Sequence, residues 1–451
     1  MKKLFGTDGI RGEAGLFPLD PPTIRSIGSS LATRLKEKLG RSPLVIVGRD
    51  TRESGEWIER ALFDGASHAG AEVRTAGVIS TPGVAYLARS LSADAGVVLS
   101  ASHNPFQDNG IKIFAPSGRK LDEATERLIE RDVFDSTTDL PLSTPIRASD
   151  SGAEDELRER YLDFLANEIG KNLSLNGLRI VIDCANGAAS NLAPQLFQRL
   201  GASVTAINNT PDGRNINLNC GSLHTESLQE KVQTQSAALG VALDGDADRS
   251  LFVDAKGQLV NGDGTLWVLA NYLRGRGRLK GETVVATVMS NLGLELALKS
   301  QGIKLMRADV GDKYVLEELL RTGASLGGEQ SGHVIFPELS LAGDGLITTL
   351  CLLRAMTDKR KPLHDLTAEF QAFPQILLNV NVKEKRPFDE VAAIQEAARR
   401  IEADLGSRGR LLLRYSGTEP LARVMIEGES QNEIERQARE LVSVIEEALG
   451  S

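Results

Sequence analysis

The sequence is poor in cysteine and in long apolar runs, and each shortage excludes a class of protein. Its 451 residues include three cysteines, Cys184, Cys220 and Cys351. They are too few and too scattered for a disulfide framework or a CxxC zinc site. No apolar run long enough for a signal peptide follows the opening MKKLFGTDGIRG, and none elsewhere is long enough to cross a membrane. We therefore expect a cytoplasmic protein with no membrane partner.

Aromatic residues are scarce, and basic residues do not outnumber acidic ones. Phe, Trp and Tyr make up 4% of the chain, and 52 Lys and Arg face 61 Asp and Glu, for a net charge of −9. Stacking platforms for single-stranded nucleic acid and a general affinity for polyanions are therefore unexpected, and we predict no nucleic-acid partner. With 41% hydrophobic and 25% charged residues, the chain has the composition of a globular protein.

Short β-branched runs alternate with helical stretches through most of the chain, which predicts βαβ crossovers and largely parallel sheets. Asn109-Gly110 is typical of a tight turn. Residues 136–155, rich in Ser, Thr, Asp and Pro, predict a linker. The expected strands are 44–47, 96–99, 111–114, 178–182, 239–243, 283–288 and 303–306.

The pattern changes from about residue 370. The order becomes strand, helix, two strands and a terminal helix, which predicts a small α+β domain with an antiparallel sheet. These elements are expected at 376–380, 387–405, 411–414, 423–426 and 432–449. At roughly 150 residues per domain, the chain length alone predicts about three domains, with a range of about two to four.

Two polar loops follow expected strands, and ligands of open α/β sheets bind beyond the carboxyl ends of strands. The loop 100–105, SASHNP, offers a hydroxyl, an imidazole and an amide, as a nucleophile or phosphate acceptor would, or it is only a polar turn. The loop 244–249, DGDADR, crowds three carboxylates. Two carboxylates about 4 Å apart repel by roughly 4 kcal/mol at an effective dielectric of about 20. A hard dication such as Mg²⁺ or Ca²⁺ would remove that cost, unless the loop is a solvated acidic turn.

Two further loops carry polar clusters. The loop 327–333, GGEQSGH, suits sugar hydroxyls or an amine, because each side chain offers a donor or an acceptor. The loop 414–420, RYSGTEP, with Arg423 beyond it, suits a phosphate dianion. Either loop could also be a surface turn. A hydroxyl, a dication site, a polyol site and a phosphate site together indicate phosphoryl transfer on a phosphosugar. Loops so far apart in the chain can meet only in a cleft between domains.

These motifs together resemble the α-D-phosphohexomutase superfamily. FGTDGIRG (5–12), PDGRNIN (211–217), TVMSNLG (287–293) and ADVGDKYV (308–315) join the four loops in the same order along the whole chain. The resemblance implies an α/β fold of four domains around a central cleft, one more than the three domains that the length favours. Three are related α/β domains with mixed or parallel sheets, and the fourth is a smaller α+β domain that resembles the TATA-binding protein. The expected bounds are 1–150, 151–255, 256–368 and 369–451.

The resemblance also implies roles for individual residues. Ser102 is similar to the serine that carries the phosphate, and is preferred to Ser100, which belongs to the strand end. Asp244, Asp246 and Asp248 resemble the ligands of one Mg²⁺, with the oxygen of phosphorylated Ser102 completing the site. Arg11, His103 and Lys112 match basic residues near the phosphoserine, and Lys112 is a candidate for proton transfer. The substrate-binding residues implied are Arg249, Glu329, Ser331, His333, Arg414, Ser416, Gly417, Thr418 and Arg423.

The implied activity is that of an isomerase, an intramolecular phosphotransferase. Gln330, where glucose and mannose mutases commonly carry Met, and the FGTDGIRG start resemble the glucosamine branch. That branch interconverts glucosamine 6-phosphate and glucosamine 1-phosphate, with glucosamine 1,6-bisphosphate as intermediate and activator, and feeds UDP-N-acetylglucosamine and peptidoglycan precursors. A phosphoglucomutase or phosphomannomutase, and an inactive phosphosugar-binding regulator, are the alternatives. We expect a monomer or homodimer whose partner is a small phosphosugar.

Overall fold

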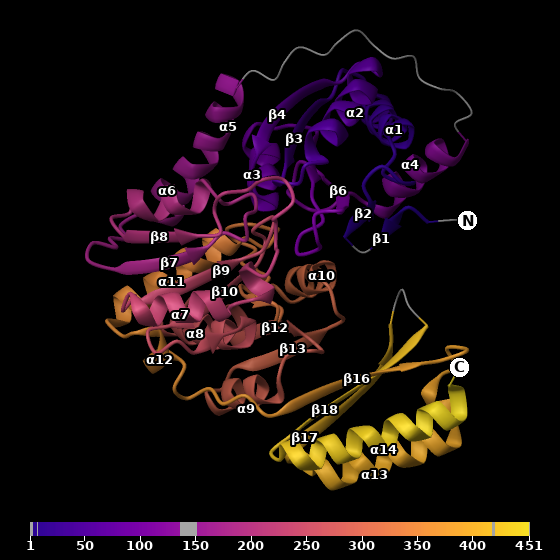
Figure 1. The fold of residues 1–451 in the computed structure, drawn as a ribbon, viewed down its shortest axis with the longest axis vertical. Helices are drawn as coiled ribbons and strands as arrows, with labels where there is room; N and C mark the ends of the chain where they lie inside the picture. Colours follow the sequence, from indigo (N-terminus) through magenta and orange to yellow (C-terminus); the bar gives the residue numbers. More distant parts are fainter. Residues whose placement is uncertain (1–2, 7, 136–150, 417–419, 451) are drawn as a thin grey trace. The chain divides into compact units, whose positions relative to one another are not determined.

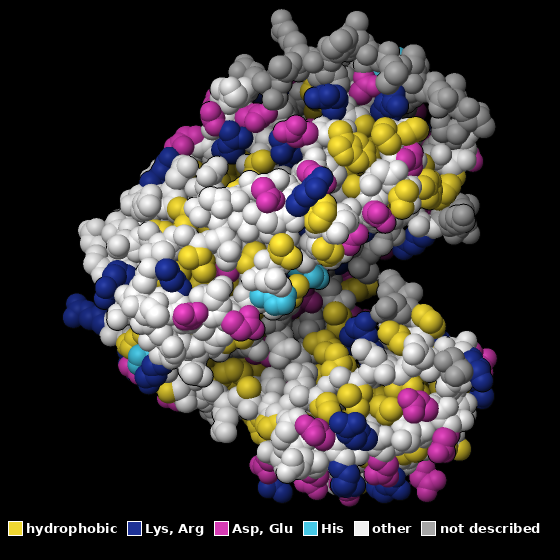
Figure 2. All heavy atoms as spheres, in the orientation of Figure 1, with side chains coloured by type: hydrophobic (Ala, Val, Ile, Leu, Met, Phe, Trp, Pro, Cys, Tyr) yellow, Lys and Arg dark blue, Asp and Glu magenta, His cyan; other side chains and the backbone are white. Residues whose placement is uncertain are grey.

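The chain folds into two compact units, each built from two separate stretches of the sequence (Figure 1). The computed structural model describes residues 3–6, 8–135, 151–416 and 420–450. The larger unit comprises Met1–Met289 and Met306–Thr367, and the smaller one comprises Ser290–Leu305 and Ala368–Ser451. No helix among the described residues is long and apolar enough to span a membrane. On the face shown in Figure 2, acidic and basic side chains are interspersed, so neither sign dominates there.

The first sheet of the larger unit has parallel strands on one side and antiparallel strands on the other. Its order is β1 (Phe5–Gly6), β2 (Gly9–Glu13), β6 (Asp108–Phe114), β5 (Ala95–Leu99), β3 (Leu44–Arg49) and β4 (Glu72–Val78). Strand β3 runs parallel to β4 and β5, whereas β6 is antiparallel to β5 and to β2. The helices of this part are α1 (Pro21–Leu39), α2 (Gly55–His68), α3 (Thr81–Ser90) and α4 (Glu123–Asp135).

The second and third sheets repeat the arrangement. The second runs β11 (Leu259–Val260), β10 (Ser250–Asp254), β9 (Leu239–Leu243), β7 (Arg179–Asp183), β8 (Ser203–Ile207). The third runs β13 (Lys304–Ala308), β12 (Thr283–Thr287), β14 (Gly327–Gly328), β15 (Val334–Ile335). All three sheets contain the same run of four strands, β4-β3-β5-β6, β8-β7-β9-β10 and β13-β12-β14-β15, so they are related by their topology.

The helices that accompany these two sheets are mostly short. They are α5 (Ser151–Asp163), the π-helix η1 (Phe164–Ile169), α6 (Leu192–Arg199), the 3₁₀ turn η2 (Gly221–Leu223), α7 (Glu226–Thr234), α8 (Gly262–Gly275), the 3₁₀ turn η3 (Lys280–Glu282), α10 (Asp312–Thr322), α11 (Gly345–Lys359) and α12 (Leu363–Leu366). The central strands β5 and β9 are buried along their whole length, as strands covered on both faces are.

The expectation of largely parallel sheets was wrong, because each of the three sheets is mixed. In each, one strand of the parallel set is followed by an antiparallel partner: β6 after β5, β10 after β9 and β15 after β14. The chain between these partners is too short to hold a crossover helix, and without one the next strand must return antiparallel. The three short connections are the loops that carry SASHNP, DGDADR and GEQSGH.

The turn expected at Asn109-Gly110 does not form, since both residues lie inside β6 and pair with β2. The Asn109 side chain donates to Ser54 Oγ at 2.8 Å, while its Oδ1 accepts from the Gly110 N–H at 2.8 Å. A Cβ on Gly110 would lie 2.6 Å from the carbonyl oxygen of Ser100 and 2.9 Å from that of Ile10. Glycine is therefore required here for close packing between strands, not for a turn.

The predicted linker 136–155 was wrong at its C-terminal end. Residues 136–150 lie outside the described residues, but 151–155 form the first turns of α5. This helix buries Leu157, Tyr161 and Leu162, and Tyr161 donates a 2.6 Å hydrogen bond to Asp344. The burial of that face outweighs the weak helix propensity of the opening Ser-Gly.

The smaller unit is an antiparallel sheet with two long helices on it (Figure 1). Its strand order is β16 (Gln375–Asn381), β18 (Leu421–Gly428), β17 (Gly409–Tyr415). Its helices and turns are α9 (Leu292–Ser300), η4 (Phe388–Glu390), α13 (Ala392–Leu405), η5 (Gly406–Arg408) and α14 (Gln431–Leu449). Residues 387–391 do not continue the expected helix 387–405, because a 3₁₀ turn is followed by Val391 in extended conformation.

The fold class is confirmed. Three α/β domains with mixed sheets and one smaller domain with a three-stranded antiparallel sheet make four domains, as the resemblance implied. Four domains lie at the upper end of the range of two to four that the length predicts, because the last domain is small. The domain bounds 1–150, 151–255, 256–368 and 369–451, and the central cleft, stay predictions.

Candidate active site

Ser102 lies in the short loop between β5 and β6, and its hydroxyl is directed at the loop 244–249. We call that loop the metal loop, because its acids are the candidate metal ligands. The residue is 1% exposed, and its Oγ donates to Asp244 Oδ2 at 2.6 Å. Its φ of 52° is in the left-handed region, a strained conformation for serine. A Cβ on Gly245 would lie 2.5 Å from the Ser102 carbonyl oxygen, so a glycine at 245 is what lets the two loops come this close.

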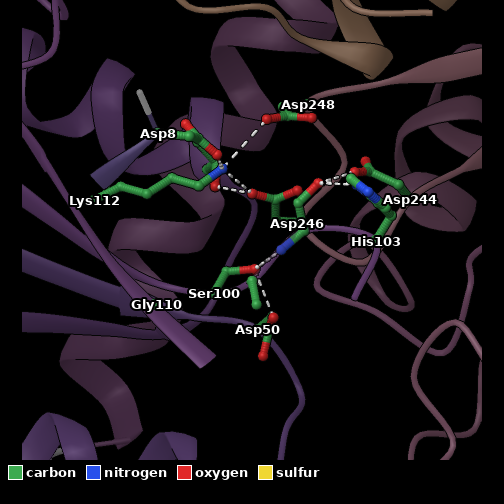
Figure 3. A network of polar contacts seen from close by, with 12 residues as sticks. Asp8, Asp50, Ser100, His103, Gly110, Lys112, Asp244, Asp246 and Asp248 are labelled. Atoms are coloured by element: carbon green, nitrogen blue, oxygen red, sulfur yellow. Dashed lines mark hydrogen bonds and ion pairs between the residues drawn. The ribbon is translucent and has the colours of Figure 1, made fainter. Parts of the chain in front are cut away.

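Ser100, the other hydroxyl of this loop, is occupied in holding the turn. Its Oγ donates to Asp50 Oδ2 at 2.6 Å and accepts from the Ser102 N–H at 3.0 Å (Figure 3). Ser100 is fully buried and faces away from the metal loop's carboxylates toward Asp50. Ser102, whose hydroxyl faces the carboxylates, therefore remains the candidate for the reacting hydroxyl.

Three carboxylates gather in the loop between β9 and β10. Asp244, Asp246 and Asp248 are buried, and a ligand atom from each lies within 4.8 Å of the others. Burial raises the pKa of Asp244 well above its usual range and also raises that of Asp248, and the neighbouring carboxylates add to both shifts. Burial also raises the pKa of Asp246, but the Lys112 charge and hydrogen bonds from Thr81 and Lys112 outweigh it and hold that pKa at about 2.

The residues of this cluster fit a hard dication. Among the described residues, Asp246 Oδ1 and Asp248 Oδ1 are buried without any hydrogen-bond partner. Buried carboxylate oxygens left in that state are costly, and an oxygen-coordinated cation relieves both the desolvation and the mutual repulsion. The Asp triad is therefore a candidate Mg²⁺ site with the Ser102 hydroxyl beside it.

Lys112, on β6, is buried among acids from two domains (Figure 3). Its Nζ lies 2.9 Å from Asp246 Oδ2, 3.1 Å from Asp8 Oδ2 and 3.5 Å from Asp248 Oδ2. Although burial lowers the pKa of the ammonium, the charges of Asp246, Asp8 and Asp248 together raise it well above its usual value. Lys112 is therefore charged, and in this state it can donate a proton but cannot accept one.

A chain of alternating charges, which no single motif of the sequence predicts, extends from Lys112. Asp8 accepts from Arg11 at 2.5 Å and from Lys120 at 2.7 Å, and Lys120 also contacts Asp312 at 2.7 Å. A cavity of about 360 Å³ has Lys112 and all of these side chains except Arg11 in its wall. Asp8 and Asp312 lie in the motifs FGTDGIRG and ADVGDKYV, which are visible in the sequence. No local feature of either motif indicates that the two acids share Lys120.

Basic residues flank the serine loop. Arg11 Nη1 donates to the Ala101 carbonyl at 3.2 Å and to Asn104 Oδ1 at 3.4 Å. His103 Nδ1 lies 3.4 Å from Ser102 Oγ. Burial, together with the positive charges of Arg249 and Arg11, lowers the pKa of His103 to about 4. The imidazole is therefore neutral near pH 7 and able to accept a proton.

The loop 327–333, which begins with β14 and leads into β15, contacts the metal loop through its backbone. We call it the sugar loop, because its residues are the candidates for binding the sugar. Arg249 and His333 form an antiparallel bridge, and the Ser250 N–H donates to the Gly332 carbonyl at 3.1 Å. Glu329 Oε1 accepts from the Gly311 N–H at 3.2 Å. His333 Nε2 lies 3.9 Å from Asp312 Oδ2, which connects the loop to the charge chain.

The side chains expected to bind the sugar differ in exposure. Glu329, Gln330 and Ser331 are partly exposed, whereas His333 is buried. Burial raises the pKa of Glu329, even though the charges of His333 and Arg249 oppose the shift. Arg249 keeps its charge, because the surrounding acids raise its pKa despite burial. The structure thus brings Ser102, the Asp triad, Lys112, Arg11 and His103 together, and Arg249 is bridged to His333 of the sugar loop.

The remaining predicted residues lie in the smaller unit. Arg414 on β17 and Arg423 on β18 are direct partners in the antiparallel pair, and Ser416 follows β17. Burial, aided by the charge of Arg423, lowers the pKa of Arg414. The Ser416 carbonyl accepts from Lys385 Nζ at 2.6 Å, which adds a third cation. Gly417 and Thr418 lie outside the described residues. Cations gathered this closely are suited to a dianion.

Four family models match successive parts of the chain. They describe the α/β/α domains I, II and III of phosphoglucomutase/phosphomannomutase, at residues 2–139, 159–257 and 261–373, and its C-terminal domain, at 377–444.

Full-length relatives agree with these matches. The phosphoglucosamine mutase of Solibacter usitatus is 49% identical over 449 residues, covering 100% of this chain and 99% of its own. That of Koribacter versatilis is 47% identical over 460 aligned residues, covering 100% and 98%.

Solved structures show the same fold. A phosphoglucomutase/phosphomannomutase family protein from Burkholderia thailandensis superposes with a TM-score of 0.79 at 25% identity, covering 99% of this chain and 98% of its own. The N-acetylphosphoglucosamine mutase of Aspergillus fumigatus, at 18% identity, superposes with a TM-score of 0.69 over 99% of this chain and 96% of its own. This chain belongs to the phosphoglucomutase/phosphomannomutase family.

Proposed function

We propose that the protein is a phosphoglucosamine mutase that interconverts glucosamine 6-phosphate and glucosamine 1-phosphate. The observation that carries the proposal is the 2.6 Å hydrogen bond from the buried Ser102 hydroxyl to Asp244, one of three clustered acids. Relatives that are 44–49% identical over the whole chain bear that name, which favours glucosamine over glucose or mannose.

The reaction would proceed in two balanced transfers. Phosphorylated Ser102 gives its phosphoryl group to O1 of glucosamine 6-phosphate: the bond from phosphorus to Ser102 Oγ breaks, the bond to O1 forms, and the O1 proton ends on Ser102. The resulting glucosamine 1,6-bisphosphate then returns its O6 phosphoryl group to Ser102, whose proton ends on O6. Ser102 is phosphorylated again, so the enzyme is unchanged by a full cycle.

The residues around Ser102 suit this transfer. Asp244, Asp246 and Asp248 would hold one Mg²⁺, which supplies neutralisation of the charge on the transferring oxygens. Arg11 and Arg249 add positive charge near the serine loop. Neutral His103, 3.4 Å from Ser102 Oγ, is placed to accept the proton, while charged Lys112 can only donate one. We therefore propose Lys112 as a proton donor, because its ion pairs favour the charged ammonium.

Substrate binding is assigned to two further sets of residues. Glu329, Ser331 and His333 would contact the sugar, and the partly exposed Gln330 offers an amide to the 2-amino group. One hydrogen bond contributes roughly 1 kcal/mol, so Gln330 alone gives modest selectivity. The non-reacting phosphate would be held by Arg414, Ser416, Gly417, Thr418 and Arg423.

A substrate panel tests the proposal. With Mg²⁺ and a trace of glucosamine 1,6-bisphosphate, kcat/KM should be higher for glucosamine phosphates than for glucose or mannose phosphates. Preference for glucose or mannose would instead establish the phosphoglucomutase or phosphomannomutase alternative. Mass spectrometry should find one phosphate on Ser102, and a protein with neither turnover nor that phosphate would be the inactive phosphosugar-binding regulator.

The cellular setting follows from the activity. Glucosamine 1-phosphate would feed UDP-N-acetylglucosamine and peptidoglycan precursors, and we place the enzyme in the cytoplasm as a monomer or homodimer. Gel filtration with light scattering decides between the two oligomeric states.

A further inference from the structure

A fully buried arginine that the reaction above does not use lies beneath the turn that carries Ser102. Arg52 follows β3, and its side chain is 0% exposed. A guanidinium has five N–H donors, and all five are used here. They donate to Asp50 Oδ2 at 2.9 Å and to the backbone carbonyls of Ser102 at 3.0 Å, Asn104 at 2.8 Å, Asp108 at 3.0 Å and Pro105.

Asn217, which comes from the second domain, binds two of the same carbonyls. Its Nδ2 donates to the Ser102 carbonyl at 2.9 Å and to the Asn104 carbonyl at 3.0 Å. A carbonyl oxygen has two lone pairs, so Arg52 and Asn217 together fill both acceptor positions of each. The serine turn is thus held by side chains from two domains at once.

Arg52 forms an ion pair with Asp50, and Asp50 connects the two to the serine turn by a second route. Asp50 neutralises Arg52 at 2.9 Å and accepts from Ser100 Oγ at 2.6 Å. Ser100 Oγ in turn accepts the N–H of Ser102 at 3.0 Å. Both the N–H and the carbonyl of Ser102 are therefore fixed by the same buried group of residues.

We infer that Arg52 and Asn217 are positioning residues for phosphoryl transfer, which hold the Ser102 turn so that its hydroxyl stays against Asp244. The inference rests on the proposed function. A non-glycine residue at a φ of 52° persists only where its surroundings impose that conformation, and the filled carbonyls do so. Displacing a reacting atom by about 1 Å can lower the reaction rate by about a hundredfold.

We refer to the hydrogen bonds from Arg52 and Asn217 to the Ser102 turn as the clamp. Asn217→Gly tests this clamp without adding backbone strain. Asn217 has a φ of +58°, which glycine adopts freely, and the substitution removes both hydrogen bonds. Asn219→Gly is the matched control, because Asn219 has a φ of +51° in the same loop, is exposed, and donates no hydrogen bond to the serine turn among the described residues.

Two measurements are made on the full chain. We expect hydrogen exchange of the segment 100–108 to be at least about tenfold faster in Asn217→Gly, and kcat to fall by about ten- to a hundredfold with KM within about twofold. Asn219→Gly should match the wild type in both. Arg52→Lys keeps the charge beside Asp50 but has three donors in place of five. It should therefore also lower kcat while leaving KM nearly unchanged. Should Arg52→Lys fail to fold, Asn217→Gly still decides.

The outcomes separate the clamp from the proposed function. Exchange and turnover of Asn217→Gly equal to those of Asn219→Gly would overturn the inference, as would a change in KM without a change in kcat. A wild-type protein with neither turnover nor phosphate on Ser102 would instead refute the proposed function, and hydrogen exchange, which needs no turnover, would then judge the clamp alone.

Discussion

Replacing Lys112 by methionine tests the buried charges at the metal loop most directly. The Lys112 side chain is 2% exposed, and its ammonium lies within 3.5 Å of Asp246, Asp8 and Asp248. Removing one partner of a buried ion pair costs about 3–5 kcal/mol, because the remaining charge is left uncompensated in a poorly solvated place. Methionine keeps an apolar stem of similar length, so the loss in the free energy of unfolding reports the charge rather than a cavity.

Mg²⁺ distinguishes this electrostatic cause from a packing defect. One ammonium cannot balance three carboxylates, and a dication at the triad takes over that role. The loss of stability in Lys112→Met should therefore be full in EDTA and clearly smaller with saturating Mg²⁺. Unit charges about 4 Å apart interact by about 4 kcal/mol at an effective dielectric of about 20. Without the competing ammonium, Mg²⁺ affinity should rise by at least about tenfold, which is about 1.4 kcal/mol.

Thermal unfolding in EDTA and in Mg²⁺, with calorimetric Mg²⁺ titration, provides the assay. Lys120→Met is the control, since Lys120 holds Asp8 and Asp312, and its loss of stability should be the same with and without Mg²⁺. Equal losses of stability for Lys112→Met in both buffers, together with unchanged Mg²⁺ affinity, would refute the reasoning. So would a Mg²⁺ dependence of Lys120→Met as large as that of Lys112→Met.

Ser102→Ala should abolish turnover and the phosphate seen by mass spectrometry while the thermal midpoint changes little; full activity would remove the serine from the reaction. Arg423→Ala should chiefly raise KM, because it loses a contact to the non-reacting phosphate, and steady-state kinetics with an unchanged KM would contradict that role. Burial raises the pKa of Asp244 and Asp248, so protons compete with Mg²⁺ as pH falls, and the Mg²⁺-dependent rise in thermal midpoint should shrink from about pH 8 to about pH 5. A constant increment would show that these carboxylates are not the ligands. Gly110→Ala should lower the free energy of unfolding by about 1–3 kcal/mol, because its Cβ would meet backbone oxygen on both sides; an unchanged denaturation midpoint would contradict the packing argument.

The sequence was informative where local chemistry decides the structure. Buried strands such as β5 and β9 are continuous apolar runs, so they were found within a residue or two. Where packing against distant residues decides, local rules failed. The dipeptide Asn109-Gly110 has the residues of a tight turn, but neighbouring backbone on both sides selects the same glycine within a strand.

The candidate site divides in the same way. Ser102 and the Asp triad stand out because their motifs concentrate reactive side chains within a few residues. Arg52 and Asn217 do not, since neither belongs to a cluster of reactive side chains, and the carbonyls of the serine turn that they bind are 50 or more residues away in the chain. Their contribution becomes visible only when the donors and acceptors of the serine turn are counted in three dimensions.

The three related sheets explain why the reactive loops are short and where they lie. In each sheet a strand of the parallel set is followed by an antiparallel partner, and the connection between the two carries the serine, the acids or the sugar cluster. Such a connection begins at the carboxyl end of a strand whose backbone is fixed by neighbours on both sides, so its side chains are held with little freedom. The same position in the topology thus carries three different candidate sites, for a nucleophile, for a metal ion and for a sugar. Because the residue types at these positions differ, comparing the loops with one another in sequence reveals no repeat, and the relation becomes apparent only from the common strand order.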